Sequence, residues 1–351
     1  MSVPVIDPFG IADDLKMPFL ARALDPHEAQ RQFECHLPRL VRERGRVQLR
    51  AIRVTRYKPG RRCLIEYDLE VDESGASQQT VVGKAKAKWL HASSYDLAKA
   101  LWNCGFASDS EDAVSVPEPI GVIPEFQMWF QRKVPGVVAT RLLANADEVV
   151  LARRIAEAIH KLHQAGIPAH RRHTMADELR ILHERPSLVA QMQPQWAERL
   201  EHLLDACDRL GASTPEPSPC GIHRDFYPDH VIVDGSRLYL LDFDLYCEGD
   251  PALDIGNFLG HLMEQSLRTL GDPDTLPDRS EALEERFLEL RGDRARAAIR
   301  AYATLTLVRH IYLSTLFPER RPFTAQLLDL CEERLGAASP TRLKGRREAY
   351  S

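Results

Sequence analysis

Residues 220–258 decide the fold class of this chain, and they read CGIHRDFYPDHVIVDGSRLYLLDFDLYCEGDPALDIGNF. Within them, residues 230–233 and 238–241 are two short apolar stretches. Asp234-Gly235-Ser236 lies between the two, and an Asp-Gly pair between apolar stretches is a strong signal for a tight turn. We therefore expect a β-hairpin of two short antiparallel strands in this segment.

Two aspartates flank the predicted hairpin. Asp225 precedes its first strand by a short loop, and Asp242 ends its second strand. Because the first strand of an antiparallel hairpin starts beside the end of the second, we expect the two carboxylates to converge at one end of the sheet. Phosphoryl transfer needs such a pair: one carboxylate orients an attacking hydroxyl and accepts its proton, and the other holds Mg²⁺ on the phosphates.

Outside this segment, the chain changes character near residues 134–136. The first third contains strand-like stretches, with β-branched residues and partial alternation, and one or two helices. Beyond Val134-Pro135-Gly136 the sequence is strongly helical. We expect strands at 46–57, 63–71, 80–89, 120–123 and 126–131, and helices at 25–44, 93–104, 144–165, 175–183, 194–210 and after 254. This order predicts an α+β fold with a sheet-rich N-lobe, 1–134, and a helical C-lobe, 135–351, which includes the hairpin segment 220–258.

Composition argues against several classes of protein. The 351 residues carry a formal net charge of -5, so a broad cationic surface for nucleic acid is not expected. No stretch approaches the about 20 apolar residues of a membrane span, and the N-terminus lacks the pattern of a signal peptide. The seven cysteines are odd in number and never spaced Cys-x-x-Cys, which argues against a disulfide framework and a cysteine zinc site. We expect a soluble, cytoplasmic enzyme with no nucleic-acid or membrane partner.

Other enzyme architectures lack their motifs here. The sequence has no Gly-x-x-x-x-Gly-Lys-Ser/Thr, no Gly-x-Gly-x-x-Gly after a strand and no Gly-x-Ser-x-Gly. P-loop enzymes, Rossmann dehydrogenases and α/β-hydrolases are therefore disfavoured. His160 and His163 have the spacing of a shared metal site on a helix, but without a His-Glu-x-x-His motif a helix packed on the core is the better interpretation.

Three motif parts follow one another in the segment 220–258. They are His223-Arg224-Asp225, then Asp242-Phe243-Asp244, then Gly249-Asp250-Pro251-Ala252-Leu253-Asp254. In this order they resemble the catalytic core of the aminoglycoside phosphotransferase and choline kinase superfamily, a branch of the protein-kinase-like fold. The resemblance implies a two-lobed fold, with a small antiparallel-sheet N-lobe and a larger, mainly helical C-lobe. It also implies transfer of the γ-phosphate of ATP, with Mg²⁺, to a hydroxyl of a small molecule such as an aminoglycoside, choline or a sugar.

The resemblance assigns roles to the motif residues. Asp225 would be the catalytic base, and His223 would brace the catalytic loop. Asp242 would be the principal Mg²⁺ ligand. Asp250 and Asp254 would support the loops of the active site.

One position departs from the family pattern. Five residues after Asp225, where the family has Asn, this chain has His230. An Asn oxygen suits Mg²⁺, whereas a histidine nitrogen is a poorer match. His230 is thus a candidate metal ligand, and contact with phosphate or with Asp225 is the alternative. A catalytically weak or inactive nucleotide-binding protein of the same fold is the alternative function.

The resemblance also implies where the nucleotide binds. Lys84 corresponds to the third-strand lysine that binds the α- and β-phosphates, and Lys86 is its rival because strand side chains repeat every two residues. Arg61 and Arg62 lie in the turn 58–62, which would cover the phosphates.

The sequence defines the binding positions of adenine and of the acceptor less precisely. Backbone groups from Gln131 to Val134 would bind adenine at the hinge between the lobes. The acceptor would lie on the C-terminal helices, roughly residues 256–320. Acidic residues there would favour a cationic acceptor, although solvated helix faces are the better interpretation. These residues are Glu264, Glu281, Glu284 and Glu285.

Overall fold

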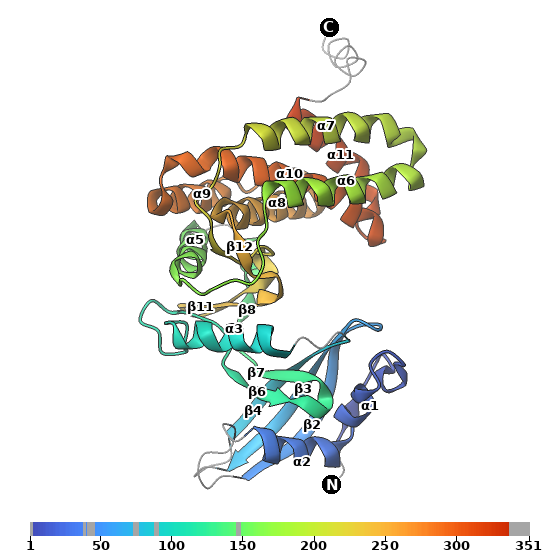
Figure 1. Cartoon of the computed structure of the whole chain (residues 1–351), viewed down its shortest axis with the longest axis vertical. Helices are drawn as coiled ribbons and strands as arrows, with labels where there is room; N and C mark the ends of the chain where they lie inside the picture. The colour runs from blue at the N-terminus through green and yellow to red at the C-terminus, as the bar shows by residue number, and fades with distance from the viewer. Residues whose placement is uncertain are drawn as a thin grey trace. The chain divides into compact units, whose positions relative to one another are not determined.

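The computed structural model describes residues 3–37, 40, 46–72, 77–87, 91–144 and 149–336. By its internal contacts the chain divides into two compact units. The first unit is formed by residues 1–136 and 232–243, and the second by residues 137–231 and 244–351. Strands dominate the first unit and helices the second, which confirms the predicted α+β class (Figure 1). The predicted domain limit between residues 134 and 135 stays a prediction.

The first unit contains a six-stranded sheet in the order β1-β2-β3-β4-β7-β6 (Figure 1). β1 runs parallel to β2, and all other neighbours are antiparallel. The bounds are Val5–Ile6 for β1, Arg46–Lys58 for β2, Arg62–Asp72 for β3, Ser77–Lys86 for β4, Met128–Arg132 for β7 and Pro119–Ile123 for β6. The predicted strands are confirmed, except that the strand expected from residue 126 begins at Met128, after the 3-10 turn Pro124–Phe126. Residues 88–89 of the third predicted strand lie outside the described residues.

The helices of the first unit are α1, Phe19–Ala23, α2, Pro26–His36, and α3, His91–Asn103. Asp25 caps α2 by accepting the Glu28 N–H at 2.8 Å. The helix predicted over 25–44, with Pro38 as a possible point of kinking or splitting, ends at His36: Leu37 already leaves the helical conformation, as expected for a residue before proline. Residues 38–39 and 41–45 lie outside the described residues.

Aromatic side chains join α2 to the sheet. Phe33 of α2 meets the ring of Tyr67 edge-on, with centroids 4.9 Å apart, and the ring of Phe130 at 5.5 Å. All three side chains are fully buried, and each such burial stabilises the fold by roughly 1.5–3 kcal/mol. The Tyr67 hydroxyl donates to the Ala23 carbonyl at 3.0 Å, so its polar atom is satisfied inside the core.

The predicted hairpin is confirmed. It consists of β10, Val231–Asp234, and β11, Arg237–Leu240, joined by the two residues Gly235 and Ser236. Gly235 has a φ of 56°, which glycine adopts without strain. On its other side β11 pairs in parallel with β5, Val114–Ser115. The strand was expected to start at His230, but Pro228–His230 form a 3-10 turn, because a proline opens that turn.

The second unit is built from α-helices and a small sheet of two strands, β9, Cys220–Ile222, and β12, Cys247–Gly249. β8, Val137–Val138, precedes its first helix. The helices are α4, Ala139–Leu143; α5, Val149–Gln164; α6, Met175–Met192; α7, Ala197–Ser213; α8, Pro251–Leu270; α9, Pro277–Arg291; α10, Arg296–Leu316; and α11, Thr324–Leu335.

One of these helices is longer than predicted. α6 was expected to end at residue 183 but continues to Met192 through Pro186, which is buried in the helix. A capping box of Thr174 and Asp177 starts this helix. The packing of α6 against α7 and α10 outweighs the helix-breaking tendency of the proline.

Two glycines bring α8 against α10. A Cβ at Gly256 would lie 2.7 Å from the Ile299 carbonyl oxygen and 2.8 Å from the Ala303 nitrogen. A Cβ at Gly260, one turn on, would lie 2.7 Å from the Cβ of Thr306 and 2.9 Å from the Ala303 carbonyl oxygen. Only glycine permits this approach at Gly256, because the backbone of α10 lies in the way. α8 is thereby fixed next to the loop that follows β9, where the site lies.

We expect Gly256→Ala to lower the free energy of unfolding by about 1–3 kcal/mol, since the added methyl group forces α8 and α10 apart. Denaturant unfolding measures this. Gly211→Ala in α7 is the control, because its Cβ would meet only movable side-chain atoms, the nearest on Leu179. Equal losses in both variants would show that helix packing at Gly256 does not require glycine.

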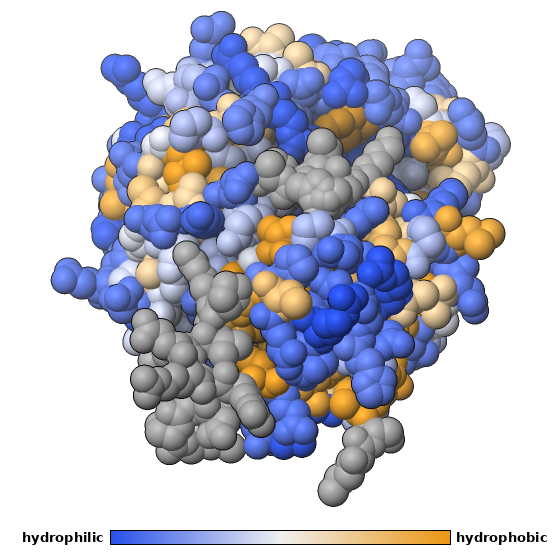
Figure 2. Space-filling model, turned by 60° about the horizontal axis from the view of Figure 1, so that its bottom comes forward, coloured by the Kyte–Doolittle hydropathy of each residue, from blue (hydrophilic) through white to orange (hydrophobic). Residues whose placement is uncertain are grey.

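None of the helices within the described residues is long and apolar enough to cross a membrane. The face of the molecule in Figure 2 is mostly hydrophilic, and the hydrophobic side chains on it form small separate groups.

Candidate active site

A buried carboxylate fixes the loop that follows β9. The two oxygens of Asp254, on α8, accept the backbone N–H groups of His223 at 2.9 Å and Arg224 at 2.7 Å. His163 of α5 contacts the same carboxylate through Nε2 at 2.8 Å, and both side chains are fully buried. The backbone of the residue before Asp225 is therefore fastened from two helices. This arrangement agrees with the supporting role that the resemblance gave Asp254.

The fastened backbone is unusual at Arg224. Its φ is 69°, a left-handed conformation that costs a residue with a side chain of order 1–3 kcal/mol. The two hydrogen bonds to Asp254 offset this cost. They present the next residue, Asp225, with its side chain 42% exposed, whereas Asp254 is inaccessible.

His230 lies against the backbone of Asp225. Its Nδ1 is 2.7 Å from the Asp225 carbonyl oxygen and 4.0 Å from Oδ2. Because a carbonyl oxygen only accepts, Nδ1 carries the proton, and Nε2 is the nitrogen that a metal or phosphate would meet. The His230 ring also stacks on His223, with centroids 5.6 Å apart. Of the contacts considered for His230, with a metal, with phosphate or with Asp225, the structure shows the one with Asp225.

Asp242 lies in the first unit, directly after β11. It has a φ of 61°, and Asp is one of the few residues besides glycine that adopts this conformation readily. A 3-10 turn, Phe243–Leu245, follows it. The convergence of Asp242 with Asp225, and the metal-binding roles of Asp242 and His230, stay predictions.

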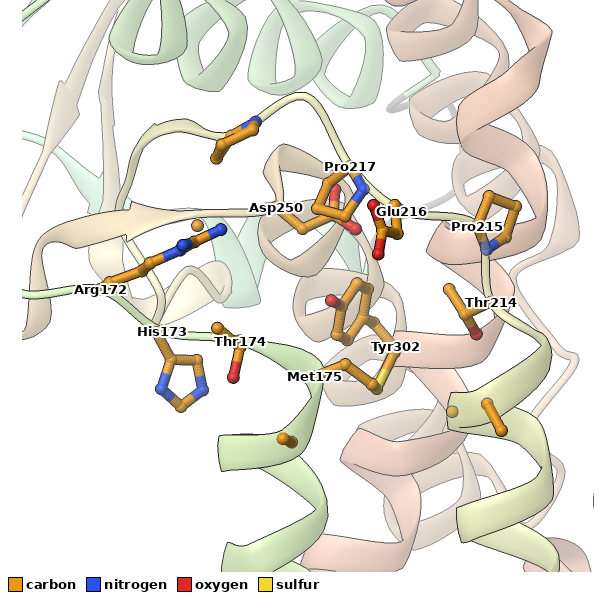
Figure 3. A pocket seen from close by; sticks show the side chains of 15 residues that line it. Arg172, His173, Thr174, Met175, Thr214, Pro215, Glu216, Pro217, Asp250 and Tyr302 are labelled. Carbon is orange, nitrogen blue, oxygen red and sulfur yellow. The ribbon is translucent and has the colours of Figure 1, made fainter.

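Asp250 supports α8 and not the loop directly. It caps α8 by accepting the Ala252 N–H at 2.9 Å. Burial raises the pKa of its carboxyl, against the opposing effect of hydrogen bonds from Ala252 and Tyr302. Asp250 lies on the wall of a cavity of about 390 Å³ with Tyr302 and Glu216 (Figure 3). Since its oxygens are already used by the helix and by Tyr302, it acts as a structural carboxylate.

A second buried chain of charges reaches the same loop. His173 contacts Glu178 at 2.6 Å, and Glu178 contacts Arg309 of α10 at 3.4 Å. Arg309 donates to Asn257 of α8, which in turn donates to the Phe226 carbonyl at 2.8 Å. Burial acts to raise the pKa of Glu178, but the hydrogen bond from His173 and the charge of Arg309 outweigh it and lower that pKa. The loop is thus held on both sides of Asp225.

Lys84 and Lys86 lie on the same face of β4, as predicted. Lys84 pairs in register with Trp129 of β7, and its Nζ lies 4.9 Å from the centroid of the Trp129 ring. Lys86 lies 3.4 Å from the hydroxyl of Ser94. Both lysines thus lie on the same side of the sheet. Which of them binds the phosphates stays a prediction.

Arg61 lies in the turn between β2 and β3 and is exposed. Arg62 is the first residue of β3 and is half-buried. Gly60 has a φ of 59°, and its N–H donates to Asp14 Oδ2 at 2.7 Å. The Tyr57 hydroxyl donates to the same oxygen at 2.7 Å. This bond, with help from the backbone N–H of Gly60, lowers the pKa of Asp14 and raises the pKa of Tyr57 to about 12. Asp14 therefore stabilises the turn, a role that the sequence did not suggest.

The predicted hinge follows β7. Gln131 is buried within β7, and Val134 lies after its end. Lys133 donates its N–H to the Thr80 carbonyl at 2.9 Å, so the chain leaves the sheet in a fixed direction. A Cβ at Gly136 would lie 2.3 Å from the Val233 carbonyl oxygen, which requires glycine here. Adenine binding by this backbone stays a prediction.

Sequence reasoning missed several site residues, although it expected Asp254 from the family motif. His163, the partner of Asp254, was set aside as a core histidine. Asn257 and Arg309 had no local signal. Within the described residues no group of three His, Cys, Asp or Glu side chains is placed to hold a metal ion, so the zinc hypothesis for His160 and His163 finds no support.

Comparisons with known proteins agree with this architecture. The family model described as phosphotransferase enzyme family matches residues 92–308. Together with the fold and the Asp225 loop, this match defines a small-molecule kinase. The chain belongs to the phosphotransferase enzyme family. No curated protein matches it.

Solved structures share the two-lobed, kinase-like fold at low sequence identity. A choline/ethanolamine kinase family protein from Mesorhizobium loti is 12% identical, with a TM-score of 0.53, over 82% of this chain and 89% of that one. A thermostable mutant of aminoglycoside phosphotransferase APH(4)-Ia, in ternary complex with AMP-PNP and hygromycin B, is 16% identical, with a TM-score of 0.55, over 84% and 95%. Plasmodium vivax ethanolamine kinase is 13% identical, with a TM-score of 0.53, over 83% and 84%.

Proposed function

We propose that this protein transfers the γ-phosphate of ATP to a hydroxyl group of a small molecule, with Asp225 as the catalytic base. The observation that supports the proposal best is the Asp225 loop. An exposed carboxylate lies directly after a backbone that the buried Asp254 fixes. Complexes of similar proteins with AMP-PNP and with ADP support an adenine nucleotide as the donor.

On the acceptor side, Asp225 accepts a hydrogen bond from the attacking hydroxyl and takes its proton as the new O–P bond forms. The bond between the γ-phosphorus and the bridging oxygen breaks, and ADP leaves with the bridging oxygen. His223 and His230 keep the loop in place, since His230 donates to the Asp225 carbonyl. Positioning and electrostatic stabilisation supply most of the catalysis in such reactions.

On the nucleotide side, Lys84 neutralises the α- and β-phosphates, with Lys86 as the alternative. Arg61 and Arg62 contribute charge in place of a run of glycines, on a turn that Asp14 keeps rigid. The backbone from Gln131 to Val134 binds adenine.

The carboxylate of Asp242 fits a hard divalent cation, because Mg²⁺ prefers oxygen ligands. Asp242 would hold Mg²⁺, with His230 Nε2 as a weaker second candidate. When bound, the ion neutralises charge that develops on the phosphate oxygens. The protein's own part is to place Asp242 directly after β11, in a left-handed backbone conformation.

Asp242→Asn tests the nucleotide half of the proposal. We expect it to weaken ATP binding about tenfold or more in the presence of Mg²⁺ and to leave binding without Mg²⁺ nearly unchanged. Asn also tolerates a positive φ, so the backbone should persist. Calorimetry with and without Mg²⁺ measures both affinities. An unchanged Mg²⁺ dependence would remove Asp242 from the metal site.

A second candidate function is nucleotide binding without turnover. The contact of His230 with Asp225 favours it, because the side chain at the family's Asn position supports the loop instead of offering an oxygen. Release of ADP that depends on an added alcohol separates the two functions. Acceptor-dependent ADP supports the kinase, and Mg²⁺-dependent binding with no such release supports the second candidate.

A further inference from the structure

We propose that the acceptor carries a carboxylate or phosphate group besides its reactive hydroxyl, and that it binds against a ring surface formed by Tyr227 and His261. This inference rests on the proposed function and names the substrate class of the same site. It differs from the cationic acceptor that the acidic residues of the C-terminal helices would favour.

The ring surface begins beside Asp225. His230 lies 4.0 Å from Asp225 Oδ2, and its ring centroid lies 4.1 Å from that of Tyr227. Tyr227 stacks on His261 of α8, with centroids 4.5 Å apart and planes at 19°. Both side chains are half-buried, so part of each lies at the surface. The surface is thus continuous with the carboxylate that takes the proton.

Behind this surface lies a third ring. His310 of α10 is buried and meets His261 edge-on, with centroids 4.5 Å apart. Burial lowers the pKa of both imidazoles well below the usual value, and the nearby guanidinium groups of Arg309 and Arg320 act on His261 in the same direction. The lowered pKa values favour the neutral form of both rings, so the positive charge beside them comes from the arginines.

Apart from Asp225 itself, the two carboxylates Glu264 and Glu178 near the ring surface are already paired. Glu264 is buried and contacts two arginines, Arg268 at 3.2 Å and Arg320 at 3.8 Å, which leaves one positive charge in excess. Glu178 contacts both His173 and Arg309. Neither carboxylate can bind an ammonium group without losing these partners.

The other acidic residues offer no better site for a cation. Glu284 contacts Arg296 and Arg300, and Glu281 and Glu285 are exposed on α9. Asp229, in the catalytic loop, is exposed and accepts a hydrogen bond from Thr140. The excess charge at Arg268 and Arg320 favours an anionic group on the acceptor, and the rings favour a flat or sugar-like body.

Two matched sets of alcohols test the acceptor class. The pyranoses are glucose, glucosamine, glucuronate and glucose 6-phosphate; the small alcohols are glycerol, 3-amino-1,2-propanediol and glycerate. ADP release with ATP and Mg²⁺ gives kcat/KM for each. We expect the anionic member to exceed its ammonium counterpart by about tenfold or more, with the difference shrinking as salt rises. Comparing kcat/KM for glucuronate with kcat/KM for glucose 6-phosphate shows whether the site prefers a carboxylate or a phosphate group.

Arg320→Gln tests the source of the preference. We expect it to raise KM for the best anionic acceptor about tenfold, with kcat and the affinity for ATP unchanged. Arg300→Gln is the control, because Arg300 contacts only the outlying Glu284 among the carboxylates named here. Equal effects in the two variants would overturn the role of Arg320.

A higher kcat/KM for glucosamine, 3-amino-1,2-propanediol, kanamycin or choline than for every anionic alcohol would overturn the inference while leaving the kinase intact. Failure of all anionic alcohols, with Mg²⁺-dependent ATP binding preserved, would also count against the acceptor class alone. Loss of ATP binding itself would instead contradict the proposed function.

Discussion

Asp225→Asn is expected to reduce phosphate transfer by about 10²–10⁴-fold, the usual contribution of a positioned general base. An amide cannot take the proton of the attacking hydroxyl. Nucleotide affinity should stay nearly unchanged, because the substitution removes the base and not the phosphate contacts. Acceptor-dependent ADP release measures the rate, and calorimetry measures the affinity.

Asp229→Asn is the matched control for this variant. Asp229 belongs to the same loop, is exposed, and accepts a hydrogen bond from Thr140 that an amide oxygen can also accept. Its transfer rate should stay within a few-fold of the parent protein. Full activity in Asp225→Asn would show that another group takes the proton, and the assigned mechanism would be wrong.

Asp254→Asn is expected to lower both stability and turnover. Asp254 accepts from two backbone N–H groups and contacts His163, so an amide NH₂ would face at least one donor. Removing one partner of such a buried charged cluster costs about 3–5 kcal/mol. We expect a loss of this size in denaturant unfolding, and a fall in kcat as the loop before Asp225 loosens.

Asp250→Asn provides the comparison, since Asn caps a helix about as well as Asp and keeps an oxygen for the Ala252 N–H. A loss below about 1 kcal/mol is expected there. If Asp254→Asn were no more damaging than Asp250→Asn, the buried carboxylate would not be what fixes the loop.

The hairpin and the helical remainder were predictable because their signals are local. An Asp-Gly turn between apolar stretches and the Thr174 capping box each lie within a few residues. The errors at His36, Met192 and His230 concern the ends of elements. Each of these ends was misjudged because a proline lies near it, and tertiary packing decides whether the proline ends the element. Proline stops α2 and opens a 3-10 turn, yet it is tolerated inside the buried α6.

The contacts that complete the site were not predictable from one sequence. His163 and Asp254 are 91 positions apart, and Arg309 and Asn257 are 52 apart. The motif 249–254 marks Asp254, but nothing in the local pattern distinguishes His163, Asn257 or Arg309 from ordinary helix residues. Glu264 was expected to lie on a solvated helix face, with cation binding as the alternative, but the structure buries it between two arginines. Pairing of charges over such distances is decided by the fold.

Thermal unfolding with ATP, with and without Mg²⁺, tests the central claim most directly. A ligand that binds only the folded protein raises the midpoint, by the equivalent of about 2.7 kcal/mol at a concentration of 100 times Kd. We predict a clear rise with ATP and Mg²⁺ together, a smaller one with ATP alone and none with Mg²⁺ alone. An unchanged midpoint with ATP and Mg²⁺ would contradict the proposal that this protein is an ATP-dependent phosphotransferase.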